Sequence, residues 1–440
     1  MSLTTSPQAQ KLNDTILQHN PFIYSLLSHK GQHAYFPKEG IVAQSAQAKN
    51  KKYNATIGVA LDDNNDPLFL SAIQEKILLP PKDIYLYASS YGIPELRQEW
   101  KKHIYEQNPT LTKSQPNTPI SQPIIANGLT HALQIIGQLF INKDDHIILP
   151  DLFWGNYKLI FEHANHAQLI TFPLFTENRF NLSGLSQTLN QQTQQNKKKV
   201  ILLNFPNNPT GYTPTRDEAQ EIVHLLKSDA EKGNNLLIIC DDAYFGFFYE
   251  PETFKESLFS LLANAHPNIL AVKIDGASKE LYSWGLRVAF ITYGSKNISP
   301  ETLTALEEKT AGALRGSISN ASQLSQQLVL NALTNKKTQV DQHHHFSLLQ
   351  SRYHTIKTIL NNQKYIPYFT PLPCNSGYFL CLKPHRGTAE QIRQILLEKY
   401  DTGVIAQNNL IRIAFSSLRE DQIEQVIENI AQACQEIAQK

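Results

Sequence analysis

A lysine and an arginine in one turn-rich segment are the first residues whose types and spacing suggest chemistry. Lys279 lies eight residues before Arg287, and apolar runs at 269–272 and 288–293 flank the pair. A lysine held between two strands can be partly desolvated, which lowers its pKa and frees its amine to form an imine with an aldehyde. The arginine suits a phosphate carried by the same molecule. Two surface cations in a loop would fit equally well, so the pair alone leaves both interpretations open.

Polar side chains also follow two other predicted strands. Asp241 ends the apolar run 236–241 three residues before Tyr244, and Asn208 lies in the proline- and glycine-rich turn 204–212. A carboxylate after so apolar a run is costly unless it is paired, so we expect it to face a cation such as a protonated ring nitrogen. Tyr244 would reach an oxygen of that ring, and Asn208 offers a donor and an acceptor. The alternatives are a helix cap for Asp241 and a structural turn around Asn208.

A glycine and a tryptophan also lie next to the ends of predicted secondary-structure elements. Gly128 precedes a predicted helix, where it would let backbone N–H groups approach an anion. Trp154 follows the predicted strand 146–150 and offers an indole face for stacking on a planar ring. Either residue would also be ordinary in a helix start or a hydrophobic core.

The elements that must position these residues alternate along the middle of the chain. Strands are predicted at 146–150, 168–172, 200–204, 236–241 and 269–274, and helices at 68–79, 96–107 after Pro94, 130–140, 155–163 and 216–232. This rhythm predicts an α/β fold, with a mostly parallel sheet sandwiched by helices and a site at the C-terminal ends of its strands.

The pattern changes after Pro300 to long helices with few strands. Helices are expected at 301–333 with an interruption near Gly316, and at 339–361, 389–400 and 422–438; strands are expected at 378–383 and 410–415. We therefore expect residues 1–67 to join a smaller α+β domain formed by 319–440, and residues 68–318 to form the large cofactor-binding domain.

Composition excludes several classes of protein. The 440 residues are 41% hydrophobic and 18% charged with a net charge of +1, which favours neither nucleic acid nor a membrane surface. Four scattered cysteines predict neither disulfides nor structural zinc, and the polar N-terminus and the lack of long apolar runs predict a soluble cytoplasmic protein. The three histidines at 343–345 would point in different directions on a helix, so we expect a polar face and no metal.

Taken in order, these motifs resemble the class I/II aminotransferases of pyridoxal-phosphate fold type I, and their aspartate/aromatic branch in particular. The resemblance runs from about residue 53 to the C-terminus and includes the segments 87–97, 375–379 and 410–415. It implies that Lys279 forms the imine with pyridoxal 5'-phosphate and then moves a proton. It also implies that Asp241 faces the ring nitrogen, that Asn208 and Tyr244 contact the ring 3-oxygen, and that Trp154 stacks on the ring.

The resemblance implies further roles at the phosphate and substrate ends. The phosphate would be held by Arg287, the helix start at Gly128, Leu129 and Thr130, and Tyr87 from the second subunit of a homodimer. Many family members carry a serine where this chain has Gly276, and Ser278 is the candidate to replace it. The substrate carboxylate would be held by Arg412, with Asn208, Gly58 and Val59 nearby and Asn375 as a lesser candidate. Arg315 would bind a distal carboxylate or be structural.

We therefore expect transfer of an amino group from an L-amino acid, dicarboxylic or aromatic by preference, to a 2-oxo acid. The first alternative is another reaction on the same scaffold, such as a β-lyase or decarboxylase, since the site residues are shared. The second is a ligand-sensing domain of a regulator, against which the short, weakly basic N-terminus argues.

Overall fold

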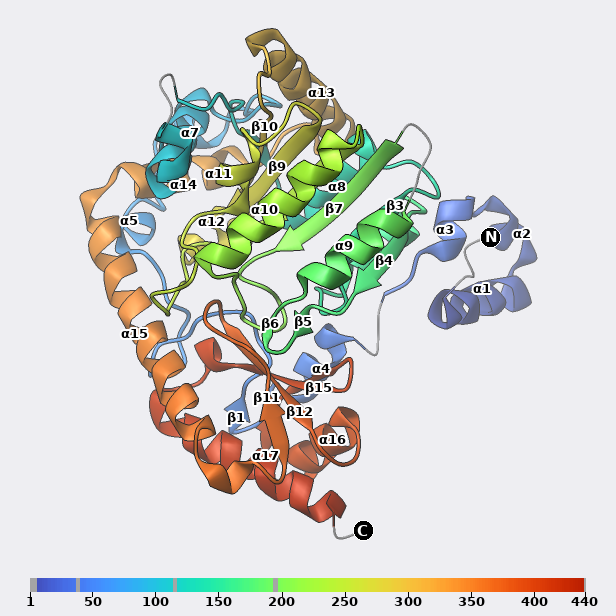
Figure 1. Ribbon diagram of the computed structural model, residues 1–440, viewed down its shortest axis with the longest axis vertical. Coiled ribbons are helices and arrows are strands. Elements are labelled where there is room, and N and C mark those ends of the chain that lie inside the picture. Colours follow the sequence, from blue (N-terminus) through green and yellow to red (C-terminus); the bar gives the residue numbers. More distant parts are fainter. Residues whose placement is uncertain (1–5, 37–39, 114–116, 193–196, 439–440) are drawn as a thin grey trace.

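A computed structural model describes residues 6–36, 40–113, 117–192 and 197–438. Its centre is a seven-stranded sheet with helices on both faces (Figure 1). The strand order is β2 (Ile124–Ala126), β10 (Ala289–Gly294), β9 (Ile269–Gly276), β8 (Asn235–Asp241), β7 (Lys198–Asn204), β3 (His146–Pro150) and β4 (Gln168–Phe172). All neighbouring strands are parallel except β10, which runs antiparallel to both neighbours. The predicted α/β class and its five strands are confirmed.

The inner strands of this sheet are mostly apolar because both of its faces are covered. In β7, Val200 and Leu202 pack on one face while Ile201 and Leu203 pack on the other. The helices of the sheet region are α7 (Pro94–Gln107), α8 (Leu129–Phe140), α9 (Leu182–Gln191), α10 (Arg216–Glu231), α11 (Leu258–Leu262), α12 (Ala277–Glu280) and α13 (Pro300–Ile318). Figure 1 shows α9 and α10 side by side across one face.

A four-stranded antiparallel sheet forms the other end of the molecule. Its order is β11 (Phe369–Pro371), β12 (Phe379–Pro384), β15 (Leu410–Ala414) and β14 (Ile405–Gln407). The helices here are α14 (Gln323–Thr334), α15 (Lys336–Leu360), α16 (Ala389–Lys399) and α17 (Ile423–Ala438). The break between α13 and α14 lies close to the predicted interruption near Gly316.

The N-terminal segment contacts two different parts of the molecule. Helix α4 (Ile41–Gln47) packs near β14, and β1 (Tyr53–Asn54) pairs with β13 (Thr402–Gly403). The preceding helices are α1 (Pro7–His19), α2 (Pro21–Leu26) and α3 (His29–His33). The ring of His29 lies 5.4 Å from that of His166, just before β4, so α3 contacts the large sheet region. The three-part domain division stays a proposal.

Two predicted helices are shorter than expected. The prediction of a helix at 68–79 is wrong for most of that range: only α5 (Ser71–Gln74) is helical there. A separate short helix, α6 (Pro81–Ile84), follows it. Ile77 and Leu78 are 60% and 91% exposed, so no packed face holds a second turn. The helix predicted at 155–163 is a π-helical segment, Lys158–His163. Two short hairpin strands, β5 (Phe175–Thr176) and β6 (Arg179–Phe180), complete the strands of the described chain.

Candidate active site

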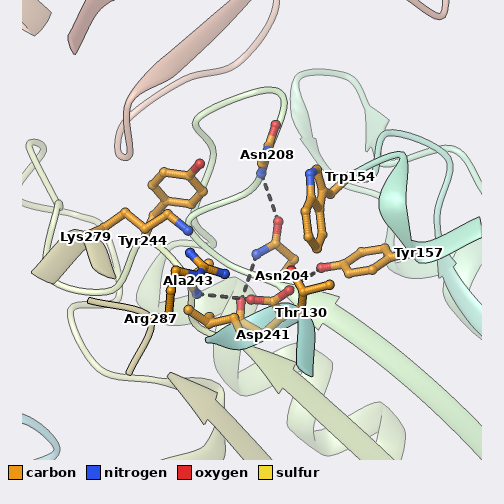
Figure 2. Close-up of a pocket in the computed structure, with 11 residues that line it drawn as sticks. Thr130, Trp154, Tyr157, Asn204, Asn208, Asp241, Ala243, Tyr244, Lys279 and Arg287 are labelled. Carbon is orange, nitrogen blue, oxygen red and sulfur yellow. Dashed lines mark hydrogen bonds between the residues drawn. The ribbon is translucent and has the colours of Figure 1, made fainter. Parts of the chain in front are cut away.

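A pocket opens at the C-terminal ends of β7 and β8, where the parallel strands were expected to place their polar side chains (Figure 2). It encloses about 550 Å³, counting the space at its mouth. The residues that line it are Leu129, Thr130, Trp154, Tyr157, Asn204, Asn208, Asp241, Ala243, Tyr244, Lys279 and Arg287. Residues separated by up to 158 positions thus meet at one edge of the sheet.

Lys279 enters the pocket from α12, a single turn that continues directly from β9. Its Nζ lies 4.9 Å from the centre of the Tyr244 ring. The pKa of Lys279 is lowered to about 8, chiefly by burial; nearby Asp241 opposes this shift and Arg287 adds to it. A larger share of the amine is therefore unprotonated near neutral pH than in an ordinary lysine, which suits a nucleophile.

Asp241 lies at the bottom of the pocket and is 2% exposed. Its carboxylate accepts a hydrogen bond from the Tyr157 hydroxyl at 2.5 Å and another from the backbone N–H of Ala243 at 3.1 Å. Burial raises the pKa of Asp241, while the Tyr157 bond and nearby Lys279 favour the ionised form. A buried carboxylate whose partners include no bonded cation is suited to a positively charged ligand atom.

The wall opposite Lys279 is held by a chain of amide contacts. The Asn204 side chain donates to the carbonyl of Asp241 at 2.8 Å and accepts from the backbone N–H of Asn208 at 2.9 Å. Figure 2 shows the Trp154 indole standing over this side of the pocket. Tyr157 and Asn204 received no role from the sequence, although both lie in segments that also contain predicted site residues.

One end of the pocket is shaped for an anion. Gly128 has φ 83°, and a Cβ built on it would lie 2.4 Å from Nη2 of Arg287. Only glycine therefore lets the Arg287 guanidinium approach the N-terminus of α8, where Leu129 and Thr130 present their backbone groups. The buried Oγ of Ser278 has no hydrogen-bond partner within the described chain, although Ser278 does not line the pocket.

Close packing between β9 and β10 accounts for the glycine at position 276. A Cβ at this position would lie 2.6 Å from the carbonyl oxygen of Val288 and 2.9 Å from Cα of Ala289 on the neighbouring strand β10. Because these contacts are backbone atoms, a serine would require β10 to move. The departure of Gly276 from the serine common in the family is thus tied to the close approach of β9 and β10.

Arg412 is 3% exposed on β15 and projects toward the turn that carries Asn208. Its guanidinium donates to Oδ1 of Asn208 at 3.2 Å and to the carbonyl of Thr56 at 2.9 Å, and it lies 4.4 Å from the Phe379 ring centre. Burial lowers the pKa of Arg412. Among the described residues it has no acidic partner, and its Nε has no acceptor.

Gly58 and Val59 lie beside this arginine site. A Cβ on Gly58 would meet the Phe379 ring at 3.3 Å and the Tyr244 hydroxyl at 3.4 Å, while the Val59 carbonyl accepts from Ser416. Asn375 is engaged elsewhere, since its amide exchanges two hydrogen bonds of 2.8 Å with the backbone of Thr213.

Two predicted site residues, Tyr87 and Arg315, lie at the surface of this single chain and do not line the pocket. Tyr87 is 93% exposed, and Arg315 is exposed on α13. The segments that carry them meet at one point, where the Ser90 hydroxyl donates a hydrogen bond to the backbone carbonyl of Ser319 at 2.8 Å.

The described ranges contain no group of three His, Cys, Asp or Glu side chains that could hold a metal ion. No described helix combines the length and apolar character that crossing a bilayer requires.

Comparison with known proteins agrees with this site. The family model for aminotransferase class I and II matches residues 50–430, so the chain belongs to that family, as the order of motifs predicted. An aspartate aminotransferase of a Bacillus species is 24% identical over 357 residues, covering 78% of this chain and 82% of that protein. One from Sulfurisphaera tokodaii is 27% identical over 215 residues, so the match spans about half of either protein, 48% of each.

The fold agrees as well. The crystal structure of an aminotransferase from Anaerococcus prevotii superposes with a TM-score of 0.79 at 23% identity, covering 92% of this chain and 98% of that one. The expectation of a pyridoxal-phosphate enzyme is confirmed at the level of the family. The pocket fits that cofactor, because it offers an amine, a buried carboxylate, an indole and an arginine beside a helix N-terminus.

Proposed function

We propose that the protein is a pyridoxal-phosphate-dependent aminotransferase that moves an amino group from an L-amino acid to a 2-oxo acid. The observation that carries this proposal is Arg412, a buried cation without an acidic partner in the described chain, which bonds to Asn208, a residue that lines the same pocket as Lys279. Both substrates of a transaminase carry a carboxylate next to the reacting carbon, and an arginine fork binds such a group with two hydrogen bonds.

Pyridoxal phosphate, when bound, supplies an aldehyde that links to amines and a ring that accepts electrons from the carbon next to the nitrogen. The chain's own residues would do the rest. Asp241 would hold a proton on the ring nitrogen, Tyr244 and Asn208 would donate to the ring oxygen, and Trp154 would fix the ring plane. Lys279, with its lowered pKa, would take up and return the proton at the substrate carbon.

Dicarboxylic or aromatic amino acids are the proposed donors, and a cytoplasmic homodimer the proposed form. The segment 77–87 supports a subunit interface, because a second subunit would cover its large apolar side chains. Leu78, Tyr85 and Tyr87 are 91%, 82% and 93% exposed in the single chain. In such a dimer, Tyr87 and Arg315 would complete the pocket of the partner subunit.

A panel of amino donors tests the function directly. Purified protein carrying the cofactor is mixed with each L-amino acid, and the absorbance change of the bound cofactor is followed together with the appearance of the 2-oxo acid. Release of pyruvate and ammonia without amino transfer would replace this proposal by a β-lyase, and release of carbon dioxide by a decarboxylase. Arg315→Ala, run alongside, should lower turnover with dicarboxylic donors selectively if Arg315 binds the distal carboxylate.

A further inference from the structure

The residue after Lys279 is held from the side of α12 that faces away from the pocket. The carboxylate of Glu280 lies 2.5 Å from Nε2 of His103 on α7, and its backbone carbonyl accepts a hydrogen bond from Nε2 of Gln342 on α15 at 3.0 Å. Helices α7 and α15, which make these two contacts, lie far apart in the sequence. Helix α12 has four residues, so its own hydrogen bonds hold little more than one turn.

A cavity leaves this side of α12 without close packing. It encloses about 570 Å³, counting its open mouth, and is lined by His103, Glu280 and Gln342 together with the rings of Phe245 and Phe247. Glu280 already bonds to both His103 and Gln342 at this cavity, so these groups do not require a ligand. These two bonds are the polar contacts that reach Glu280 from α7 and α15.

A charged network fixes the position of His103 in turn. Burial opposes protonation of His103, but Glu280 and Asp275 beside it raise its pKa, while Lys273 has the opposite effect. Asp275 on β9 accepts from the Trp100 indole on α7 at 3.1 Å and lies 3.2 Å from Lys273. Helix α7 is thereby tied to the strand that leads into α12.

We infer that Glu280 is a positioning residue for Lys279, acting as a clamp that joins α12 to α7 through His103 and to α15 through Gln342. The inference rests on the proposed function, because the position of the Lys279 amine matters for the proton transfer assigned to it. Misplacing a reacting group by about 1 Å costs roughly 100-fold in rate. Loosening the turn should therefore lower kcat without weakening the contacts that bind substrate at Arg412.

The kinetic test uses the cofactor-loaded enzyme and four variants. Glu280→Ala should lower kcat by roughly 10- to 100-fold, with KM for the amino donor within about twofold of the wild type. Glu280→Gln, whose amide oxygen can still accept from His103, should retain most of kcat. Gln342→Leu, which removes the other contact without disturbing a buried charge, should give an intermediate loss. Glu99→Ala, which removes a partly exposed acid on the helix that carries His103, α7, is the matched control.

A second readout does not depend on turnover. In the full chain without cofactor, the rate at which an amine-reactive reagent labels Lys279 is measured against pH by peptide mass spectrometry. The wild type should show a midpoint near 8, and Glu280→Ala should move it toward 10.5, the ordinary value for lysine, because the amine becomes more solvated.

The outcomes separate the clamp from the function on which it rests. An unchanged labelling midpoint in Glu280→Ala, or a kcat loss that only follows the fraction of folded protein, would overturn the clamp. A wild type that transfers no amino group would overturn the proposed function instead, and the labelling experiment would still decide whether Glu280 positions Lys279.

Discussion

Two clusters of charged side chains, a pocket cluster and an interior cluster, lie near the ends of β8 and β9. Residues that are consecutive in the sequence belong to different clusters. Asp241 and Lys279 face the pocket, whereas Asp242 and Glu280, one position later, face the interior. In the interior cluster the charges are paired: Lys273 with Asp242 at 2.5 Å and with Asp275 at 3.2 Å, and Glu280 with His103.

The pocket cluster lacks such pairs. Asp241 bonds to a tyrosine hydroxyl and a backbone N–H, and Arg412 bonds to an amide and a backbone carbonyl. A buried charge without a counter-ion is destabilising by several kcal/mol, so the pocket can hold these groups only at a cost to stability that a ligand would offset. Pairing therefore distinguishes the buried charges of the interior cluster from those at the pocket.

Removing the pocket amine should give the largest effect. Lys279→Ala removes the group proposed as both nucleophile and proton carrier, and we expect turnover to fall by about 10⁴-fold or more. The measurement is single-turnover conversion of the amino donor, together with the absorbance of bound cofactor. Lys273→Ala is unsuitable as a control because it breaks the interior cluster; Lys227→Ala, on the exposed side of α10, should leave turnover unchanged. Turnover that persists in Lys279→Ala would remove this residue from the chemistry.

Breaking the interior cluster should change stability rather than chemistry. Asp242→Asn leaves Lys273 with one acidic partner fewer, and loss of one partner of a buried pair costs about 3–5 kcal/mol of the free energy of unfolding. Urea unfolding of the cofactor-free chain measures this loss, and kcat per folded molecule should stay within a few-fold. Glu231→Gln, an exposed partner of Lys227 on α10, is the control. If stability is unchanged while kcat collapses, the two clusters do not differ as we describe.

Shortening Arg412 should weaken substrate binding. Arg412→Ala removes the fork for the carboxylate, and KM for the amino donor should rise roughly 100-fold. Arg412→Lys keeps the charge without the two-pronged geometry and should recover only part of the loss. Steady-state kinetics with the preferred donor decide this, and equal KM values in all three proteins would mean that the carboxylate binds elsewhere.

Tyr157→Phe should shift the pH dependence of the reaction. The Tyr157 hydroxyl opposes the rise that burial causes in the pKa of Asp241, so its loss raises that pKa further. Asp241 then ionises only at higher pH, and the acid limb of the kcat profile should move upward. A hydrogen bond to a charged group contributes about 1.5–3 kcal/mol, so kcat at neutral pH should fall roughly tenfold. An acid limb at the wild-type position would contradict this role.

The smallest effect is expected at Ser278, whose buried hydroxyl lacks a partner among the described residues. Many family members have a serine at the position of Gly276. If Ser278 takes over the role of that serine, Ser278→Ala removes one hydrogen bond to the phosphate. We expect the Kd for pyridoxal phosphate to rise about fivefold, since a neutral hydrogen bond contributes about 1 kcal/mol. Titration of the cofactor-free chain measures this. An unchanged Kd would leave phosphate binding to Arg287 and the start of α8.

The sequence predicted the strands well because their runs are mostly apolar, as strands covered on both faces of a sheet require. It failed at 68–79, where the apolar spacing of a helix is present but Ile77 and Leu78 meet no packing surface within the described chain. It also assigned no role to Tyr157, because nothing in the local sequence shows that a π-helical segment starting beside this tyrosine directs its hydroxyl to Asp241.

The sequence by itself determined the order of the motifs, the family they resemble and the lysine proposed to react, since these depend on residue types and spacing along the chain. The tertiary structure decided which charges are paired. Neighbours such as Asp241 and Asp242 have the same side chain and the same apolar strand before them. Only the direction in which each points, into the pocket or toward Lys273, makes one a binding group and the other part of the core.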